Sequence, residues 1–218
     1  MDTKYRQKIL ALTKEYRKDL DKNDFSHDSN HLLRVEKLAK TIAADEKADM
    51  EVVEAACLIF DLARELEDKG IVQDHAEEGV NIARKVLAKI NFPVNKIENV
   101  CHAIYVHRRS KDRIPETIEA KILRDADYLD AMGATDVTRV IASSLQTEKY
   151  KRPIYVDKVF EEGDSDISAI HFMMYQLKHE KHQPENFFTK RGKEIAKDRY
   201  LFLRDFVERF VDEWHGKK

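Results

Sequence analysis

The chain has 218 residues, of which 37% are charged and 42% hydrophobic, and its formal net charge is -2. The near balance of 39 basic and 41 acidic residues argues against a general nucleic-acid scaffold held by a basic surface. Six glycines and four prolines are few, which favours an all-α fold over strands and turns. This length is enough for one sizeable core, so we expect a single domain over residues 1–218.

The cysteines and the N-terminus indicate the environment of the chain. Cys57 and Cys101 lie in apolar segments and are expected to be buried free thiols, because two cysteines make no disulfide framework. The first ten residues contain no apolar run of signal-peptide length, and no window approaches the roughly 18 uncharged apolar residues of a membrane span. We therefore expect a cytoplasmic protein with no membrane partner.

Amphipathic segments follow one another along the chain, with polar capping residues between them. The first predicted helix covers residues 4–21. The second begins near Ser26 or Ser29, either of which could cap it, and ends near residue 45. Asp49 is the predicted cap of a third helix, which is apolar on most of its circumference and is therefore central.

Capping-box spacings open the next two helices, one at Asp74 with Glu77 and one at Asn95 with Glu98. The remaining predicted segments are a helix over 117–132 that ends at Gly133, a helix over 136–146, a loop over 147–163, and C-terminal helices over 165–182 and 189–215. The pattern predicts a helical bundle with a core at about 26–145, on which the helices of 165–215 pack.

Several polar residues lie on otherwise apolar faces. Asp61 follows an apolar run in "CLIFD", where an ionised carboxylate is costly unless a partner or a metal holds it. The others are His31, His75, His102, His107, Asp125, Asp127 and Asp130. A single inward histidine is usually a hydrogen-bonded core residue. One imidazole and two carboxylates from three separate helices, however, can surround a divalent cation.

These residues lie in stretches that resemble the HD-domain superfamily of metal-dependent phosphohydrolases. Within it, the chain is similar to stand-alone bacterial and archaeal predicted HD hydrolases, some of which act on nucleotides. The resemblance implies an HD-domain-like helical bundle. It is carried, in the family's order between 26 and 212, by "HLLRVEKLAKTIAADE", "VVEAACLIFDLARELED", "HAEEGVNIARKVL", "AIYVHR", "EAKILRDADYLDAMGA" and "TKRGKEIAKDRYLFLRDFVERF".

The resemblance also implies a metal site. In such proteins the ion is held by one histidine, an adjacent His-Asp pair and a later aspartate. The matching positions here are His31, Asp61 and Asp127, whereas the histidine of the pair falls on Phe60. Phenylalanine has no lone pair to donate, so the resemblance predicts a weakened site that suits Mn, Fe or Mg.

The implied reaction is hydrolysis of a small phosphorylated substrate, with a nucleotide as the expected class. A bound ion would lower the pKa of a water molecule for attack on phosphorus. The expected catalytic residues are Asp61, His107 and Asp130, and the expected substrate-binding residues are Arg34, Lys121 and His75. His75 and His107 match histidines of a second metal site in two-metal relatives, and either is a candidate to replace the missing ligand.

A second interpretation stays open at this point. A catalytically degenerate HD domain would bind a nucleotide or a partner protein without hydrolysis, and Phe60 is the reason to consider it. A purely structural helical protein would leave the inward acids unexplained. No basic stripe with interleaved aromatic residues indicates a nucleic-acid polymer as partner, and a homo-oligomer is compatible with the sequence.

Overall fold

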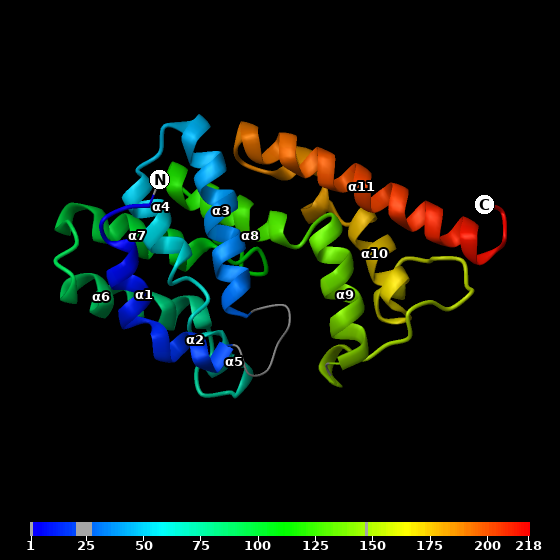
Figure 1. The fold of residues 1–218 in the computed structure, drawn as a ribbon, viewed down its shortest axis with the longest axis horizontal. Helices are drawn as coiled ribbons and strands as arrows, with labels where there is room; N and C mark the ends of the chain where they lie inside the picture. The colour runs from blue at the N-terminus through cyan, green and yellow to red at the C-terminus, as the bar shows by residue number, and fades with distance from the viewer. Residues whose placement is uncertain (1, 21–27, 147) are drawn as a thin grey trace. The chain divides into compact units, whose positions relative to one another are not determined.

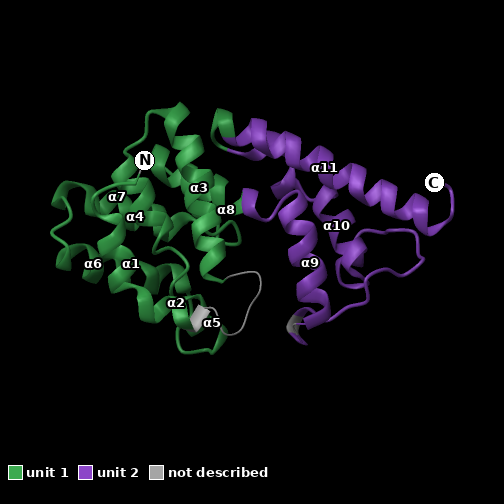
Figure 2. Ribbon diagram, in the orientation of Figure 1, with its two compact units in different colours: residues 1–128, 188–191 green, residues 129–187, 192–218 purple. Residues whose placement is uncertain are grey.

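The computed structural model describes residues 2–20, 28–146 and 148–218, and this part of the chain forms eleven α-helices and no strand (Figure 1). The all-α prediction is therefore confirmed. The chain divides into two compact units, residues 1–128 with 188–191 and residues 129–187 with 192–218 (Figure 2). The expectation of a single domain stays a prediction.

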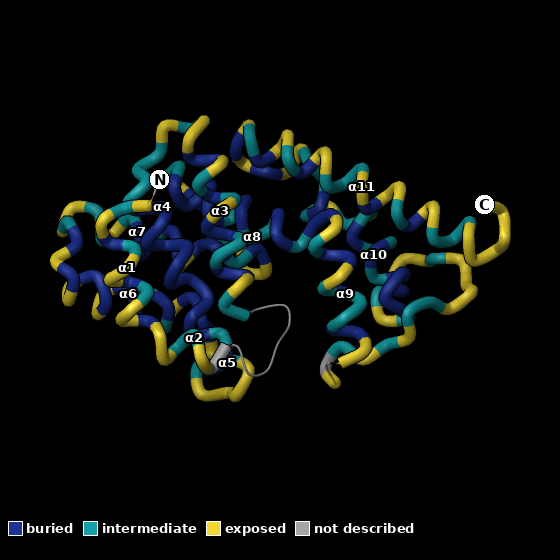
Figure 3. The backbone as a smooth tube through the Cα atoms, viewed as in Figure 1, coloured by how far each residue is buried: buried dark blue, intermediate teal, exposed yellow. Residues whose placement is uncertain are grey.

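The first unit is built around the segment 52–63, in which every residue is buried (Figure 3). Its helix α4 contacts α3 and α7, and α6 contacts α7. The helices of this unit are α1 (Arg6–Leu12), α2 (Lys14–Leu20), α3 (Ser29–Glu46), α4 (Met50–Cys57), α5 (Arg64–Asp68), α6 (His75–Lys89), α7 (Val94–Val106) and most of α8 (Ile118–Asp130). The predicted central helix thus begins the most buried part of this unit.

Two of the predicted helix caps are confirmed. The side chain of Asp49 accepts hydrogen bonds from the backbone N–H groups of Glu51 and Val52 at the start of α4. The side chain of Asp74 accepts from the N–H of Ala76 at 2.9 Å and caps α6. Each carboxylate satisfies a backbone donor that has no partner within its helix.

The cap of α3 differs from both predicted serines. Ser29 is the first residue of the helix, and Asp28 before it accepts a hydrogen bond from the N–H of His31 at 2.9 Å. Ser26 lies outside the described residues. An aspartate is as good a cap as serine, so the first turn of α3, which carries His31, is anchored by a carboxylate.

Two further boundaries also differ from the prediction. The first predicted helix is divided at Thr13, whose hydroxyl donates to the carbonyl of Ile9 at 2.8 Å. The predicted cap at Asn95 is wrong, because α7 begins at Val94 directly after Pro93. The ring of proline fixes a φ angle close to the helical value, so it can start a helix without a side-chain cap.

After Cys57 the chain leaves the helix and passes through a series of buried turns before α5 begins at Arg64. Asp61 lies in these turns, and its carbonyl accepts from the N–H of Arg64 at 3.0 Å. Gly79 of α6 faces this segment, since a Cβ atom there would lie 3.2 Å from the carbonyl oxygen of Phe60. The glycine therefore lets α6 approach the turn that carries Asp61.

The second unit packs α9 (Ala134–Gln146), α10 (Ala169–Lys178) and most of α11 (Lys190–Trp214). Gly133, at a φ of 76°, follows α8 as predicted. The predicted helix over 165–182 is shorter, with single 3-10 turns on both sides of α10, and the described part of the predicted 147–163 loop has only one such turn. The core of this unit consists of Val137, Val140, Ala169, Ile170, Met173, Leu203 and Val207.

Both cysteines are buried and free, as predicted. Burial raises the pKa of the Cys57 thiol well above its ordinary value, which keeps it protonated. Among the helices of the described residues, none combines the length and the apolar character that a membrane span requires.

Candidate metal centre

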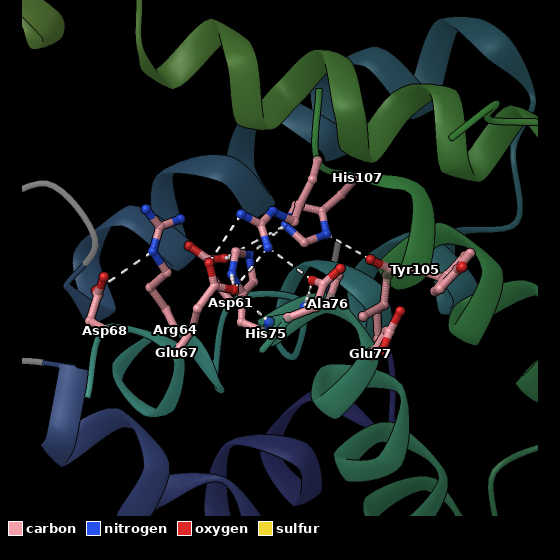
Figure 4. Close-up of polar contacts among 12 residues, drawn as sticks. Asp61, Arg64, Glu67, Asp68, His75, Ala76, Glu77, Tyr105 and His107 are labelled. Carbon is pink, nitrogen blue, oxygen red and sulfur yellow. Dashed lines mark hydrogen bonds and ion pairs between the residues drawn. The ribbon is translucent and has the colours of Figure 1, made fainter. Parts of the chain in front are cut away.

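Three ionisable side chains of the first unit converge on one point (Figure 4). Asp61 comes from the turns after α4, His75 is the first residue of α6, and His107 directly follows α7. The Nε2 atom of His75 lies 3.0 Å from Oδ1 of Asp61 and 3.2 Å from Nε2 of His107. The Nε2 atom of His107 lies 3.6 Å from the same carboxylate oxygen. We call this group the Asp61–His75–His107 cluster.

The other nitrogen of each imidazole is already engaged. The Nδ1 atom of His75 lies 2.7 Å from a carboxylate oxygen of Glu67, and Nδ1 of His107 lies 2.6 Å from the carbonyl oxygen of Ile104. Both of these oxygens only accept, so each Nδ1 carries a proton and donates. In a neutral imidazole the lone pair then belongs to Nε2, and both lone pairs face Asp61.

This donor set fits a metal ion. Two imidazole lone pairs and a carboxylate oxygen are all acceptors, and their ligand atoms lie within 4.8 Å of one another with every side chain buried. Acceptors in such proximity need a positive charge among them, which a divalent ion or a proton on one Nε2 can provide. A mixed nitrogen and oxygen set is typical of sites for first-row divalent metals.

Asp61 is ionised in this environment. Burial by itself raises the pKa of its carboxyl group. In the state in which a proton rather than a metal provides the positive charge, Nε2 hydrogen bonds from the His107 and His75 rings outweigh burial and hold the pKa well below the ordinary value of 3.8. A carboxylate must be deprotonated to bind a metal, so Asp61 has the charge that the site requires.

His31 and Asp127 lie on the other side of Asp61. The Nε2 atom of His31 is 3.3 Å from Oδ1 of Asp127 and 3.9 Å from Oδ2 of Asp61. The three residues predicted as metal ligands are therefore neighbours. Among the described residues, however, the set that contains Asp61 and has all its ligand atoms within 4.8 Å of one another includes His75 and His107 rather than His31 and Asp127. The predicted ligand set stays a prediction.

Phe60 forms the apolar wall of this region. Its side chain is fully buried, and its ring packs edge-on against His31, at a centroid distance of 5.7 Å, and against His107, at 5.0 Å. A phenyl ring donates no electron pair to a metal, so at this position the chain contributes packing alone.

The remaining predicted site residues, Arg34, Lys121 and Asp130, differ in where they lie relative to the site. Arg34 follows His31 by three residues on α3 and shares its face of the helix. Lys121 precedes Asp127 by six residues on α8, about 240° around the helix axis, so it points to another side. Asp130 belongs to the second unit, where it is buried and accepts from Arg139 at 2.9 Å. The roles assigned to these residues stay predictions.

The polar residues that support His75 were not among the predicted site residues. Glu67 and Asp74 both accept from Arg108, at 2.8 Å and 2.9 Å. Burial raises the pKa of Asp74, but Arg108, the N–H of Ala76 and the charge of Arg113 lower it to about 2. Glu67 stands in the charged run "ELED", which resembles a solvated surface, so no signal in the sequence distinguished it.

A separate acidic group, Asp2, Glu36 and Glu54, also has ligand-like spacing. Lys40 makes ion pairs with all three carboxylates, and Arg6 makes two hydrogen bonds to Glu36 at 2.6 Å and 2.9 Å. The positive charge that this group needs is therefore provided by the chain itself, and the group is structural.

Comparison with known proteins agrees with this architecture. The HD domain family matches residues 28–132. A predicted HD superfamily hydrolase from an uncultured Thermotogales bacterium is 31% identical, with a TM-score of 0.70 and coverage of 96% of this chain and 93% of that chain. An HD-superfamily hydrolase from Bacillus thuringiensis, 22% identical, has the same fold, with a TM-score of 0.71 and coverage of 97% and 98%.

The uncharacterized protein YpgQ of Bacillus subtilis is 28% identical over 194 residues, which are 87% of this chain and 85% of YpgQ. The crystal structure of YpgQ in complex with ADP has a TM-score of 0.67 at 24% identity, with coverage of 94% of this chain and 100% of that chain. The 31% identity to the Thermotogales protein over nearly the whole of both chains, together with the HD domain match, shows that this chain belongs to the HD superfamily.

Proposed function

We propose that the chain is a metal-dependent phosphohydrolase that acts on a nucleotide or another small phosphate ester. The observation that carries the proposal is the convergence of Asp61, His75 and His107 with both Nδ1 atoms already donating elsewhere. These three residues would hold the ion, for which Mn, Fe or Mg suits the nitrogen and oxygen donors. The ADP bound in the structure of YpgQ supports a nucleotide as the substrate class.

In the proposed reaction a water oxygen attacks phosphorus, the bond from phosphorus to the leaving oxygen breaks, and a proton from the water ends on the leaving group. A divalent ion bound at this site would lower the pKa of that water and polarise a phosphoryl oxygen. Asp61 and the Nε2 atoms of His75 and His107 would hold the ion, and the buried ring of Phe60 would keep water from its apolar side.

Three further residues, Asp127, His31 and Arg34, have proposed roles in the reaction. The side chain of Asp127 is 25% exposed, whereas those of its neighbours His31 and Asp61 are at most 4% exposed. We propose that Asp127 meets the water or the leaving group and that Nε2 of His31 shares the proton with it. Arg34, on the same face of α3 as His31, is the proposed contact to the substrate phosphate.

The test is phosphate release from a panel of nucleoside mono-, di- and triphosphates with added Mn, Mg or Co. We expect turnover that depends on the metal, is lost in Asp61→Asn and is kept in Glu98→Gln, a change in an exposed ion pair with Arg84. Binding of ADP without turnover in any metal would contradict the hydrolase and favour a nucleotide-binding domain, to which Phe60 points.

A further inference from the structure

We infer that Glu67, held by Arg108, is a positioning residue that fixes both the ring orientation and the protonated nitrogen of His75. The inference deepens the proposed function, because its consequence for metal binding depends on the Asp61–His75–His107 cluster. Glu67 lies on α5, outside the cluster, and contacts Nδ1 of the His75 ring, whereas Asp61 contacts Nε2 (Figure 4).

One carboxylate of Glu67 holds His75 at two points. Its Oε2 atom accepts from the backbone N–H of His75 at 2.7 Å and from the ring Nδ1 at 2.7 Å. The backbone contact places the first residue of α6, and the ring contact sets the orientation of the imidazole. Together they direct Nε2 toward Oδ1 of Asp61 at 3.0 Å.

The protonated nitrogen matters because only one tautomer of His75 can bind a metal here. If the proton of the neutral ring moved to Nε2, it would point at Asp61 and occupy the position of the ligand lone pair. An acceptor at Nδ1 prevents this, because it keeps the proton of the ring on Nδ1 and leaves the lone pair on Nε2. Outer partners of this kind typically contribute 10- to 100-fold to metal affinity.

Arg108 connects this contact to the second imidazole. It directly follows His107, donates to both oxygens of Glu67 at 2.8 Å and 3.1 Å, and donates to Asp74, the cap of α6, at 2.9 Å. A single guanidinium thus ties α5, the start of α6 and the end of α7 together. Its charge also favours the ionised form of Glu67, which is the form that accepts from Nδ1.

The experiment compares Glu67→Ala, Glu67→Gln and the control Glu77→Gln. Glu77 is an exposed acid of the first turn of α6 that pairs with Arg113. Titration with Mn²⁺ gives the metal affinity, and long-range ¹⁵N–¹H NMR of the metal-free protein gives the tautomer of His75. The NMR measurement is independent of activity and of bound metal.

We expect Glu67→Ala to lower Mn²⁺ affinity about 10- to 100-fold and to shift His75 toward the Nε2–H tautomer. Glu67→Gln keeps an acceptor oxygen and should restore most of the affinity, and Glu77→Gln should match the wild type. If alanine prevents folding, Glu67→Asp serves instead, because it keeps the charge but withdraws the oxygen from Nδ1.

Wild-type affinity and an unchanged tautomer in Glu67→Ala would overturn the positioning role while leaving the metal site intact. Equal losses in Glu67→Gln and Glu67→Ala would also overturn it, because only alanine removes the acceptor. A wild type that binds no metal but shows the Glu67-dependent tautomer would contradict the proposed function and support the positioning role.

Discussion

Asp61 in the first unit and Asp136 in the second are both almost fully buried, at 3% and 4% exposed, yet their pKa values move in opposite directions. Burial raises the pKa of Asp136 to about 6, against the charge of Arg139 and a hydrogen bond from Gln176. At Asp61 burial has the same sign, but hydrogen bonds from the His107 and His75 rings exceed it and hold the pKa well below the ordinary value. The partners of a buried carboxyl group, rather than its burial, decide whether it is charged.

Asp61 has the surroundings of a cation site, whereas Asp136 has those of a structural core residue. Burial favours the protonated, neutral form of Asp136. The nearby cation, Arg139, already forms an ion pair with the neighbouring Asp130. Asp61 faces two imidazoles whose Nδ1 atoms donate elsewhere, so the Nε2 atom of each ring is the one that can hold a proton or a metal ion beside Asp61, and either charge favours the ionised carboxylate. Only the arrangement around Asp61 is typical of a metal centre.

The largest expected effect comes from the wall of the Asp61 site. Phe60→Ala should lower the free energy of unfolding by about 4 kcal/mol, because it removes a fully buried ring that packs against His31 and His107. Urea unfolding measures this change. Phe60→Leu, which keeps most of the volume, is the control and should cost far less; equal costs would show that the space around Asp61 does not depend on the ring.

Metal binding should stabilise the first unit through the Asp61–His75–His107 cluster and should not depend on Asp136. At about 100 times the dissociation constant, Mn²⁺ should raise the free energy of unfolding by about 2.7 kcal/mol, and a chelator should reverse the gain. Thermal unfolding with and without Mn²⁺ checks this. Asp61→Asn should show no Mn²⁺-dependent gain in stability, and Asp136→Asn should show the full gain. The opposite pattern would mean that the ion binds in the second unit.

Asp136 should make stability depend on pH. Its folded pKa of about 6 exceeds the unfolded 3.8, so the folded state binds more protons between these values and loses stability as the pH rises through them. Asp136→Asn abolishes this loss. The advantage of the variant over the wild type should grow by about 2 kcal/mol between pH 4.5 and 7.5 in urea unfolding, and an advantage that is constant with pH would contradict the raised pKa.

The smallest expected effect is a gain of affinity. Phe60→His places an imidazole next to His31 and Asp61, and the added lone pair should increase Mn²⁺ affinity by about tenfold, or about 1.4 kcal/mol. Isothermal titration of the variant beside Phe60→Leu measures it. An affinity no higher than that of Phe60→Leu would mean that position 60 does not face the bound ion.

The helical fold and most element positions followed from periodicity and capping residues, as Asp49 and Asp74 illustrate. The end of α4 at Cys57 could not be predicted, because residues 52–63 are all buried and periodicity does not distinguish buried turns from a buried helix. The break at Thr13 depends on a local hydrogen bond between its side chain and the carbonyl of Ile9, which the apolar pattern does not reveal.

Site residues could be predicted where an ionisable side chain lies on an otherwise apolar, buried face. Asp61 and His31 stood out because each interrupts an apolar face, and the structure places them 3.9 Å apart. The partnership of Asp61 with His75 and His107, and the contact of Glu67 with Arg108 across 41 residues, arise from tertiary packing. No local pattern in the sequence encodes them.

The most direct test of the central claim is the metal content of the protein after equilibrium dialysis against Mn²⁺, measured by mass spectrometry for the wild type, Asp61→Asn and Asp136→Asn. We expect stoichiometric Mn²⁺ in the wild type and in Asp136→Asn, and none in Asp61→Asn. A wild type without Mn²⁺, or an Asp61→Asn variant that retains it, would contradict the assignment of the Asp61–His75–His107 cluster as a metal centre.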